Sequence, residues 1–336
     1  MGTKRSSRQS QLFLIPSVLL VYYTSFVKNI AVKSMATLSV PMDSGNAISL
    51  HYIHNEAASS SSDLKIIEKN EDITPIILIH GLDSSSHTWR RTLNSLKAFP
   101  VYALDCRGCG RSDLGDFEKF SPDALVEDVR YFTDQRLKGK KPFVLVGHSM
   151  GGRVAMSFAA KYPERVAALV VEDMDIDRRM NNPFPSSDAV TLFDRDLKTR
   201  STEDVLDIFA KVGYPANMVQ RWINEGRIYL NDSGTSFWSD VNPAFRHLCY
   251  EHFCFTDVTL KAWETISSSS LSFPCHVMVA DDDLTICDPK SIDKMQSIMG
   301  NDRLTVHTYP GASHSIHNSA HKDFISDLTN ILQKIK

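Results

Sequence analysis

The segment Phe143-Val144-Leu145-Val146-Gly147-His148-Ser149-Met150-Gly151-Gly152 joins an apolar run to a Gly-x-Ser-x-Gly pattern and then to a helical pattern over 150–161. A sharp turn from a strand into a helix exposes a serine, and glycines two residues before and after that serine remove side chains that would collide there. The segment therefore predicts that Ser149 is a nucleophile. The Met150 N–H and the start of the helix would face a developing negative charge.

Length and composition favour one soluble α/β domain with an insertion. The chain has 336 residues, 42% of them hydrophobic, and a formal net charge of -3. This charge gives no basic surface for nucleic acid, so we expect no nucleic-acid partner. The six cysteines lack the paired spacing of a metal site, which favours free thiols over a disulfide framework. No metal-ligand cluster or phosphate-binding glycine loop is recognised, so we expect no cofactor.

The N-terminal segment differs from the rest, because it carries basic residues and no acid before Asp43. Leu12–Val27 is an apolar run interrupted by Pro16, which suits a signal peptide and is short for a membrane span. A transit peptide fits as well. We expect a targeting segment over 1–36, addressed to an organelle such as a mitochondrion or plastid. A secretory route, membrane contact through the apolar run, and an upstream extension without a role in the fold are the alternatives.

Strands alternate with amphipathic helices on both sides of the central segment. Continuous apolar runs with many β-branched residues indicate strands buried on both faces of a parallel sheet. The expected central strands are Ile73–Ile79, Val101–Leu104, Phe143–His148, Val166–Val171, Cys275–Ala280 and Leu304–Tyr309. This alternation predicts the α/β class, with a doubly wound, mostly parallel sheet. Ala47–His54 is expected as an edge strand, in a hairpin with the residues around Val40.

The strand-helix rhythm stops near Met180 and returns near residue 271. Amphipathic helices are expected at Glu203–Val212 and Ala216–Glu225, and a third over Trp238–Phe253. The sequence therefore predicts a helical lid over 181–270, inserted between two parts of one core at 37–180 and 271–336.

A serine hydroxyl is a poor nucleophile at neutral pH and needs a histidine base, which needs an acid to orient it. His314 lies after the last expected strand and before the final helix, where a base can reach Ser149. His317 and His321 are close competitors. His148 adjoins the nucleophile and is expected to shape the turn.

Four motifs in order resemble the α/β-hydrolase superfamily over residues 47–336, and within it the small serine esterases of the abhydrolase domain-containing protein 11 type. They are His80-Gly81, the run from Asp105 through Arg107 and Gly108 to Ser112, Gly147 to Gly152, and Gly311-Ala312-Ser313-His314, with an acidic cluster at Asp281–Asp283 before the last. The resemblance implies a loop of structural importance at 105–112.

The resemblance also implies the chain order Ser, acid, His for the catalytic residues. It assigns Asp283 as the acid, with Asp173, at the end of another strand, as the alternative. The oxyanion hole would be formed by the backbone N–H groups of Leu82 and Met150.

These residues predict a serine hydrolase that cleaves a carboxylic ester or thioester through an acyl-enzyme. Its partner would be a small acyl substrate with an apolar acyl group. The aromatic residues of the lid would either line the acyl pocket or pack as the core of the lid: Phe184, Phe193, Phe209, Trp222, Trp238 and Phe253. The same triad would also serve hydrolysis of a carbon-carbon bond in a vinylogous diketone. A ligand receptor without catalysis is a third hypothesis, because fold does not fix function.

Overall fold

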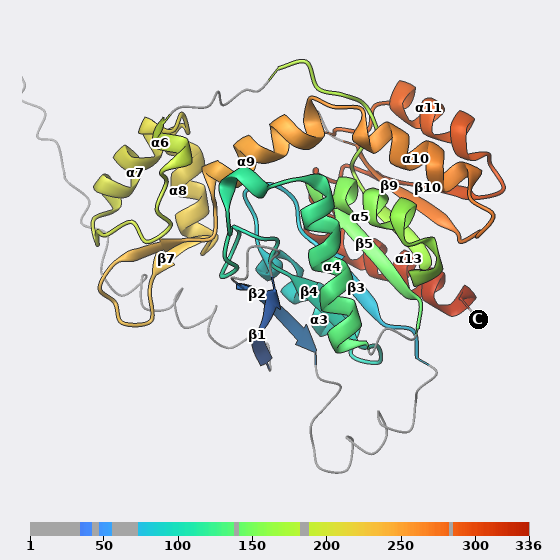
Figure 1. Cartoon of the computed structure of the whole chain (residues 1–336), viewed down its shortest axis with the longest axis horizontal. Coiled ribbons are helices and arrows are strands. Elements are labelled where there is room, and N and C mark those ends of the chain that lie inside the picture. The colour runs from blue at the N-terminus through green and yellow to red at the C-terminus, as the bar shows by residue number, and fades with distance from the viewer. Residues whose placement is uncertain are drawn as a thin grey trace, which may run out of the picture.

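A computed structural model of the chain describes residues 34–41, 47–55, 73–137, 141–181, 188–281 and 285–335. Its centre is an eight-stranded sheet with the strand order β1-β2-β4-β3-β5-β6-β9-β10 (Figure 1). The strands are β1 (Ser34–Pro41), β2 (Ala47–Asn55), β3 (Ile76–Ile79), β4 (Val101–Leu104), β5 (Phe143–His148), β6 (Val166–Glu172), β9 (Cys275–Asp281) and β10 (Leu304–Pro310).

The sheet is mostly parallel, as the sequence predicts. Strands β4, β3, β5, β6, β9 and β10 run parallel to one another, whereas β1 pairs with β2 and β2 with β4 in antiparallel register. The expected N-terminal hairpin is therefore present, and β1 is its outermost strand. The carboxyl ends of β3, β5, β6 and β9 meet at one edge of the sheet, where open α/β sheets place their binding sites.

The expected targeting segment meets the described residues only at its end. β1 begins at Ser34, so residues 34–36 belong to the sheet, and residues 1–33 lie outside the described residues. Within the part of the chain that the structure describes, no helix combines the length and the apolar character needed to cross a membrane.

Helices cover both faces of the sheet because successive side chains of each strand point to opposite sides. In β3, Ile77 and Ile79 pack in one cluster, and Ile76 and Leu78 in the other. The first cluster includes residues of α4 (Pro122–Arg136), α5 (Met150–Lys161), α10 (Val258–Ser268) and α11 (Pro289–Met299). The second includes residues of α3 (Arg90–Ser95) and α13 (His321–Lys334).

The helix α4 begins as its sequence predicts, with Ser121 Oγ accepting a hydrogen bond from Ala124 N.

The insertion forms a small helical layer at one end of the sheet, drawn in yellow and light orange at the left of Figure 1. It contains α6 (Asp188–Thr191), α7 (Thr202–Lys211), α8 (Ala216–Asn224), the short pair β7 (Ile228–Leu230) and β8 (Phe237–Ser239), and α9 (Pro243–Cys249), followed by a π-helical turn over Tyr250–Cys254. The stretch 238–253, expected as one helix, thus begins in a strand. Helix α10 falls within the range expected for the lid but packs against α5 and α11, on the core.

Gly151 lets helix α5 lie against strand β3. A Cβ at residue 151 would come within 2.3 Å of the Ile79 carbonyl oxygen and 2.6 Å of the His80 carbonyl oxygen, so the helix would have to move. Alanine otherwise favours a helix by about 1 kcal/mol over glycine. We nevertheless expect Gly151→Ala to lower the free energy of unfolding by about 3 kcal/mol or more, because backbone atoms cannot move aside as side chains do.

Gly152→Ala is the matched control for urea unfolding of Gly151→Ala. At residue 152 the nearest atoms to a Cβ are side-chain atoms of Met174 and Val171 at 3.1 Å, so its loss should be about 1 kcal/mol or less. Equal unfolding midpoints for the two variants would contradict the steric role of Gly151.

Candidate active site

Ser149 lies at a strained turn between β5 and α5. Its backbone φ is +53° and ψ is -121°, a conformation that residues with a side chain rarely adopt. A hydrogen bond from Ser149 N to the Glu172 carbonyl oxygen (2.9 Å) ties the turn to β6. Close packing surrounds it, since a Cβ at Gly147 would lie 2.2 Å from the Gly151 carbonyl oxygen. The strand, strained turn and helix therefore have the backbone geometry that the motif predicts. The sequence also predicts that the turn exposes the serine, but Ser149 is buried in this structure, with 6% of its surface exposed.

His314 lies in the loop after β10 and pairs with Asp173. Its Nδ1 donates a hydrogen bond of 2.6 Å to Asp173 Oδ2. The loop is held from the other side by His148, whose Nε2 donates to the His314 carbonyl oxygen at 2.9 Å. Burial lowers the pKa of His148 well below its ordinary value, so that ring is neutral at physiological pH. The rings of His148 and His314 pack with centroids 4.7 Å apart, which places the His314 ring beside the Ser149 turn.

The Asp173 carboxylate accepts several hydrogen bonds. The residue follows β6, has φ of +44° and is fully buried. Besides His314, its carboxylate accepts hydrogen bonds from Thr285 Oγ1 (2.7 Å), Ile286 N (3.2 Å) and Ala280 N (3.2 Å). Burial by itself would raise the pKa of Asp173, but the hydrogen bonds from His314 and Thr285 outweigh it and hold that pKa below its ordinary value. Asp173 is therefore ionised at neutral pH.

Asp283, which the resemblance implies as the acid, lies outside the described residues, in the gap 282–284. The carboxylate that the structure places on His314 is that of the alternative, Asp173. The residues just after the gap, Thr285 and Ile286, donate to Asp173. Among the described residues, no hydrogen bond joins the Ser149 hydroxyl to His314. Such contacts are often long before substrate binds.

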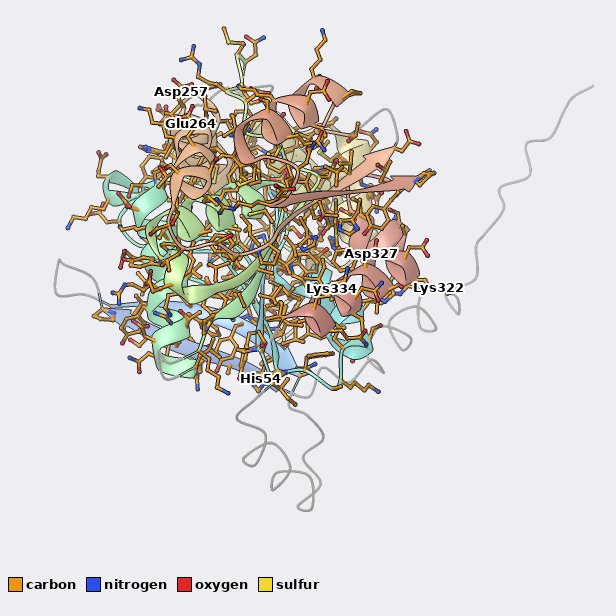
Figure 2. The ribbon with its side chains drawn as sticks, turned by 90° about the vertical axis from the view of Figure 1, so that its right-hand side faces the viewer. His54, Asp257, Glu264, Lys322, Asp327 and Lys334 are labelled. Carbon is orange, nitrogen blue, oxygen red and sulfur yellow. The ribbon has the colours of Figure 1, made fainter. Side chains whose placement is uncertain are left out.

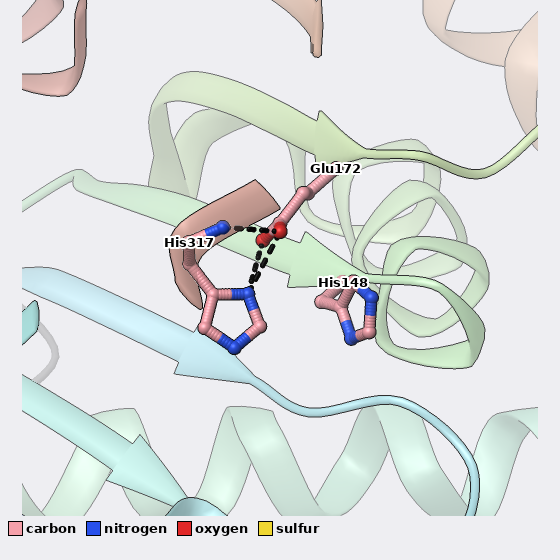
Figure 3. Close-up of side chains that lie close together, drawn as sticks. All are labelled: His148, Glu172 and His317. Atoms are coloured by element: carbon pink, nitrogen blue, oxygen red, sulfur yellow. Dashed lines mark hydrogen bonds and ion pairs between the residues drawn. The ribbon is translucent and has the colours of Figure 1, made fainter. Parts of the chain in front are cut away.

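Both ring nitrogens of His317, the competing base, form hydrogen bonds to other side chains. His317 is fully buried, and its Nδ1 donates to Glu172 Oε1 at 2.7 Å, as Figure 3 shows. Its Nε2 accepts from Thr88 Oγ1 at 2.7 Å, and the ring of Trp89 packs on it with centroids 4.1 Å apart. His317 N also donates to Glu172 Oε1. His317 thus fixes the loop that carries His314, and sequence reasoning missed its partner Glu172.

The other competitor, His321, also has a structural role. Its Nδ1 donates to the His317 carbonyl oxygen at 2.8 Å, and its Nε2 pairs with Ser95 Oγ at 2.9 Å. Both bonds join helix α13 to its neighbours. His321 is therefore placed to hold α3 and the C-terminal helix together.

Three residues within the described ranges come close enough to bind one metal ion. His148, Glu172 and His317 each offer a ligand atom, and these atoms lie within 4.8 Å of one another (Figure 3). However, Glu172 already accepts hydrogen bonds from the ring and the backbone N–H of His317. A cation would have to break this buried pair, so the donor set fits a hydrogen-bond network better than a metal centre.

The predicted oxyanion donors flank Ser149. Met150 is the first residue of α5, so its N–H has no acceptor within the helix. The loop with Leu82 passes close by, because a Cβ at Gly81 would lie 2.8 Å from Ser149 Cβ. Both backbone groups therefore lie next to the turn that carries the hydroxyl.

The loop 105–112 frames the site through buried hydrogen bonds. Asp105 accepts from His51 Nδ1 at 2.7 Å and from Ser86 N at 2.6 Å, while Ser112 Oγ donates to the Asp105 carbonyl oxygen at 2.8 Å. Arg107 forms a double hydrogen bond to Asp128, with both distances 2.6 Å. These contacts match the structural role that the resemblance implies for the loop.

The aromatic residues expected in an acyl pocket pack mostly inside the protein. Phe209 and Trp222 are buried in the apolar core of the lid, with Phe193 against it. Phe253 packs in the main core, and Trp238 lies beside Arg195. Phe184 lies outside the described residues. Two roles are expected for these residues, lining an acyl pocket or packing within the protein. The described aromatic residues have the second role.

Comparisons with known proteins agree with this architecture. A family model described as the alpha/beta hydrolase fold matches residues 74–319. The alpha/beta hydrolase domain-containing protein VTE7 of Arabidopsis thaliana is 36% identical over 137 residues, covering 40% of this chain and 38% of that protein. Lipase LipV of Mycobacterium tuberculosis is 39% identical over 98 residues, covering 29% of this chain and 36% of the lipase. The chain thus matches little more than a third of the length of either relative.

Among solved structures, the thioesterase domain from the curacin biosynthetic pathway superposes with a TM-score of 0.62 at 16% identity, covering 88% of this chain and all of that domain. At this identity the likeness concerns the fold alone. The family match spans most of the described core and includes Ser149, Asp173 and His314. The chain therefore belongs to the α/β-hydrolase fold family.

Proposed function

We propose that this protein is a serine hydrolase that cleaves a carboxylic ester or thioester through an acyl-enzyme, with Ser149 as nucleophile, His314 as base and Asp173 as acid. The observation that carries the proposal is the 2.6 Å hydrogen bond between His314 Nδ1 and the buried Asp173, directly behind the strained turn of Ser149. A histidine held in this way keeps its Nε2 unprotonated and available to a serine hydroxyl.

In the first half of the reaction, Ser149 Oγ attacks the carbonyl carbon and its proton passes to His314 Nε2. Asp173 stabilises the imidazolium that forms. The Leu82 and Met150 N–H groups donate to the oxyanion of the tetrahedral intermediate. When the intermediate collapses, His314 returns the proton to the leaving alcohol or thiol, and Ser149 carries the acyl group.

In the second half, a water molecule attacks the acyl carbon and gives its proton to His314. The ester bond to Ser149 Oγ then breaks, the serine oxygen takes the proton back, and the carboxylic acid leaves. Both halves use the same residues, so the reaction needs no group beyond the substrate and water.

A fluorophosphonate probe tests the proposal on the wild-type protein. The probe forms a covalent bond to an activated serine, and we expect one adduct by intact mass, mapped by peptide analysis to Ser149. Folded protein that takes up no probe, or an adduct on another serine such as Ser84 or Ser112, would contradict the proposal. Heat-unfolded protein is the control, since activation requires the folded site.

Turnover defines the substrate class. A series of p-nitrophenyl esters and acyl thioesters of increasing chain length, compared by kcat/KM, measures the size and polarity of the acyl site. Turnover of a vinylogous diketone without turnover of any ester would instead favour carbon-carbon bond hydrolysis. Saturable ligand binding without turnover would favour a receptor.

A further inference from the structure

Three side chains of the lid converge on one residue of the core, Asp83. Arg246, in α9, donates to both carboxylate oxygens of Asp83, with the Nε contact at 3.2 Å. The hydroxyl of Tyr214 donates to Asp83 Oδ1 at 3.2 Å. Arg227 Nη1 donates to the Asp83 carbonyl oxygen at 2.8 Å. The lid therefore holds both the side chain and the backbone of this residue.

Asp83 directly follows Leu82, the predicted oxyanion donor. It is 7% exposed and has a backbone φ of +52°, a conformation that is costly for a residue with a side chain. Such a conformation persists only where its surroundings enforce it. The double hydrogen bond from Arg246 and the bond from Arg227 supply this enforcement from outside the core.

The same loop is anchored at a second point by the lid. Ser85 Oγ donates to Asp240 Oδ2 at 3.0 Å, and Asp240 lies between β8 and α9. On the core side, Asp105 accepts from Ser86 N. The segment 83–86 is thus bound between lid and core, so the position of the Leu82 N–H depends on the lid.

We propose that the Asp83–Arg246 pair is a positioning device for the oxyanion hole, which becomes complete only when the lid is docked on the core. The inference rests on the serine hydrolase function proposed above. The Arg246 guanidinium fixes the Asp83 carboxylate, which fixes the turn at Leu82 and Asp83 and directs the Leu82 N–H at the developing oxyanion. Leu82 then contributes to catalysis through its backbone, while Asp83 and Arg246 act through Leu82.

Arg246→Met removes the pair while keeping an apolar chain of similar length. A misplaced oxyanion donor weakens binding of the transition state and leaves binding of the ground state nearly unchanged. We expect kcat to fall by about 100-fold, with KM changed by less than about threefold. Arg246→Lys, which retains the positive charge but not the two-nitrogen fork, should recover part of the loss. Arg221→Met is the control, because Arg221 is an exposed lid arginine that contacts only Glu225 among the ion pairs described.

A trifluoromethyl ketone distinguishes positioning from a general structural role. This inhibitor forms a tetrahedral oxyanion on the serine, so its affinity should fall by about the same factor as kcat/KM in Arg246→Met. A lowered unfolding temperature with unchanged kcat, or a rise in KM at constant kcat, would overturn the inference.

Tyr214→Phe keeps the test informative if Arg246→Met fails to fold, because it removes the hydroxyl that donates to Asp83 and leaves both charged groups of the Asp83–Arg246 pair in place. We expect kcat to fall by about threefold, and unchanged kcat in this variant counts against the inference. If the proposed serine hydrolase function is wrong, the wild-type protein neither turns over esters nor takes up fluorophosphonate. If only the positioning role is wrong, the wild-type protein is still labelled.

Discussion

Replacing Ser149 with alanine is expected to lower kcat for the best ester or thioester substrate by about 10⁶-fold. The substitution removes the nucleophilic oxygen, so no acyl-enzyme can form, and His314 and Asp173 have no hydroxyl left to activate. The backbone donors at Leu82 and Met150 remain, and they can still support slow attack by water. Purified variant and wild type are compared by steady-state turnover, and the loss should appear in kcat with little change in KM.

Ser157→Ala is the matched control for Ser149→Ala. Ser157 lies in the same helix α5, and its buried hydroxyl has no hydrogen-bond partner among the described residues. Removing it should change kcat by less than about twofold. Ser149→Ala should also unfold at or above the wild-type temperature, because the substitution removes no side-chain hydrogen bond that the structure describes. Retention of more than about 1% of wild-type kcat in Ser149→Ala would contradict the nucleophile.

The fold and the strained turn at Ser149 can be predicted from sequence because their determinants are local. The buried strand 143–148, the glycines at 147 and 151, and the helix from Met150 lie within one short segment, and the turn follows from their order. The structure bears out the parallel sheet for the same reason, since each central strand carries its own apolar run. Sequence pattern predicts a structural feature well where one short segment contains all the residues that determine it.

The acid and the lid contacts depend on distant segments, which local pattern cannot resolve. Strands β6 and β9 are parallel neighbours, so their carboxyl ends lie at the same edge of the sheet. The direction of Asp173 is set by donors from residues 280, 285 and 286, more than 100 positions along the chain. Asp83 and Arg246 are separated by 163 positions. The sequence could name both acids, and the packing of these distant segments places the Asp173 carboxylate against His314.

Asp173→Asn is expected to reduce kcat by about 10⁴-fold. In the wild type, the carboxylate accepts the His314 Nδ1 proton and leaves Nε2 able to accept the proton of Ser149. An asparagine amide can donate to Nδ1 instead, which moves the ring proton to Nε2 and blocks that transfer. It also cannot stabilise the imidazolium of the transition state with a negative charge. The measurement is steady-state kcat of the variant and the wild type at the same pH, repeated at several pH values.

Asp283→Asn is the contrasting variant, because it removes the charge of the other predicted acid and leaves Asp173 in place. If Asp173 orients His314, Asp283→Asn should retain kcat within about tenfold of wild type. The opposite pattern, a loss of about 10⁴-fold in Asp283→Asn and a small loss in Asp173→Asn, would assign the acid to Asp283. Circular dichroism and urea unfolding of both variants separate a catalytic loss from a folding loss. That control matters most for Asp173, since its carboxylate also accepts hydrogen bonds from Thr285, Ile286 and Ala280.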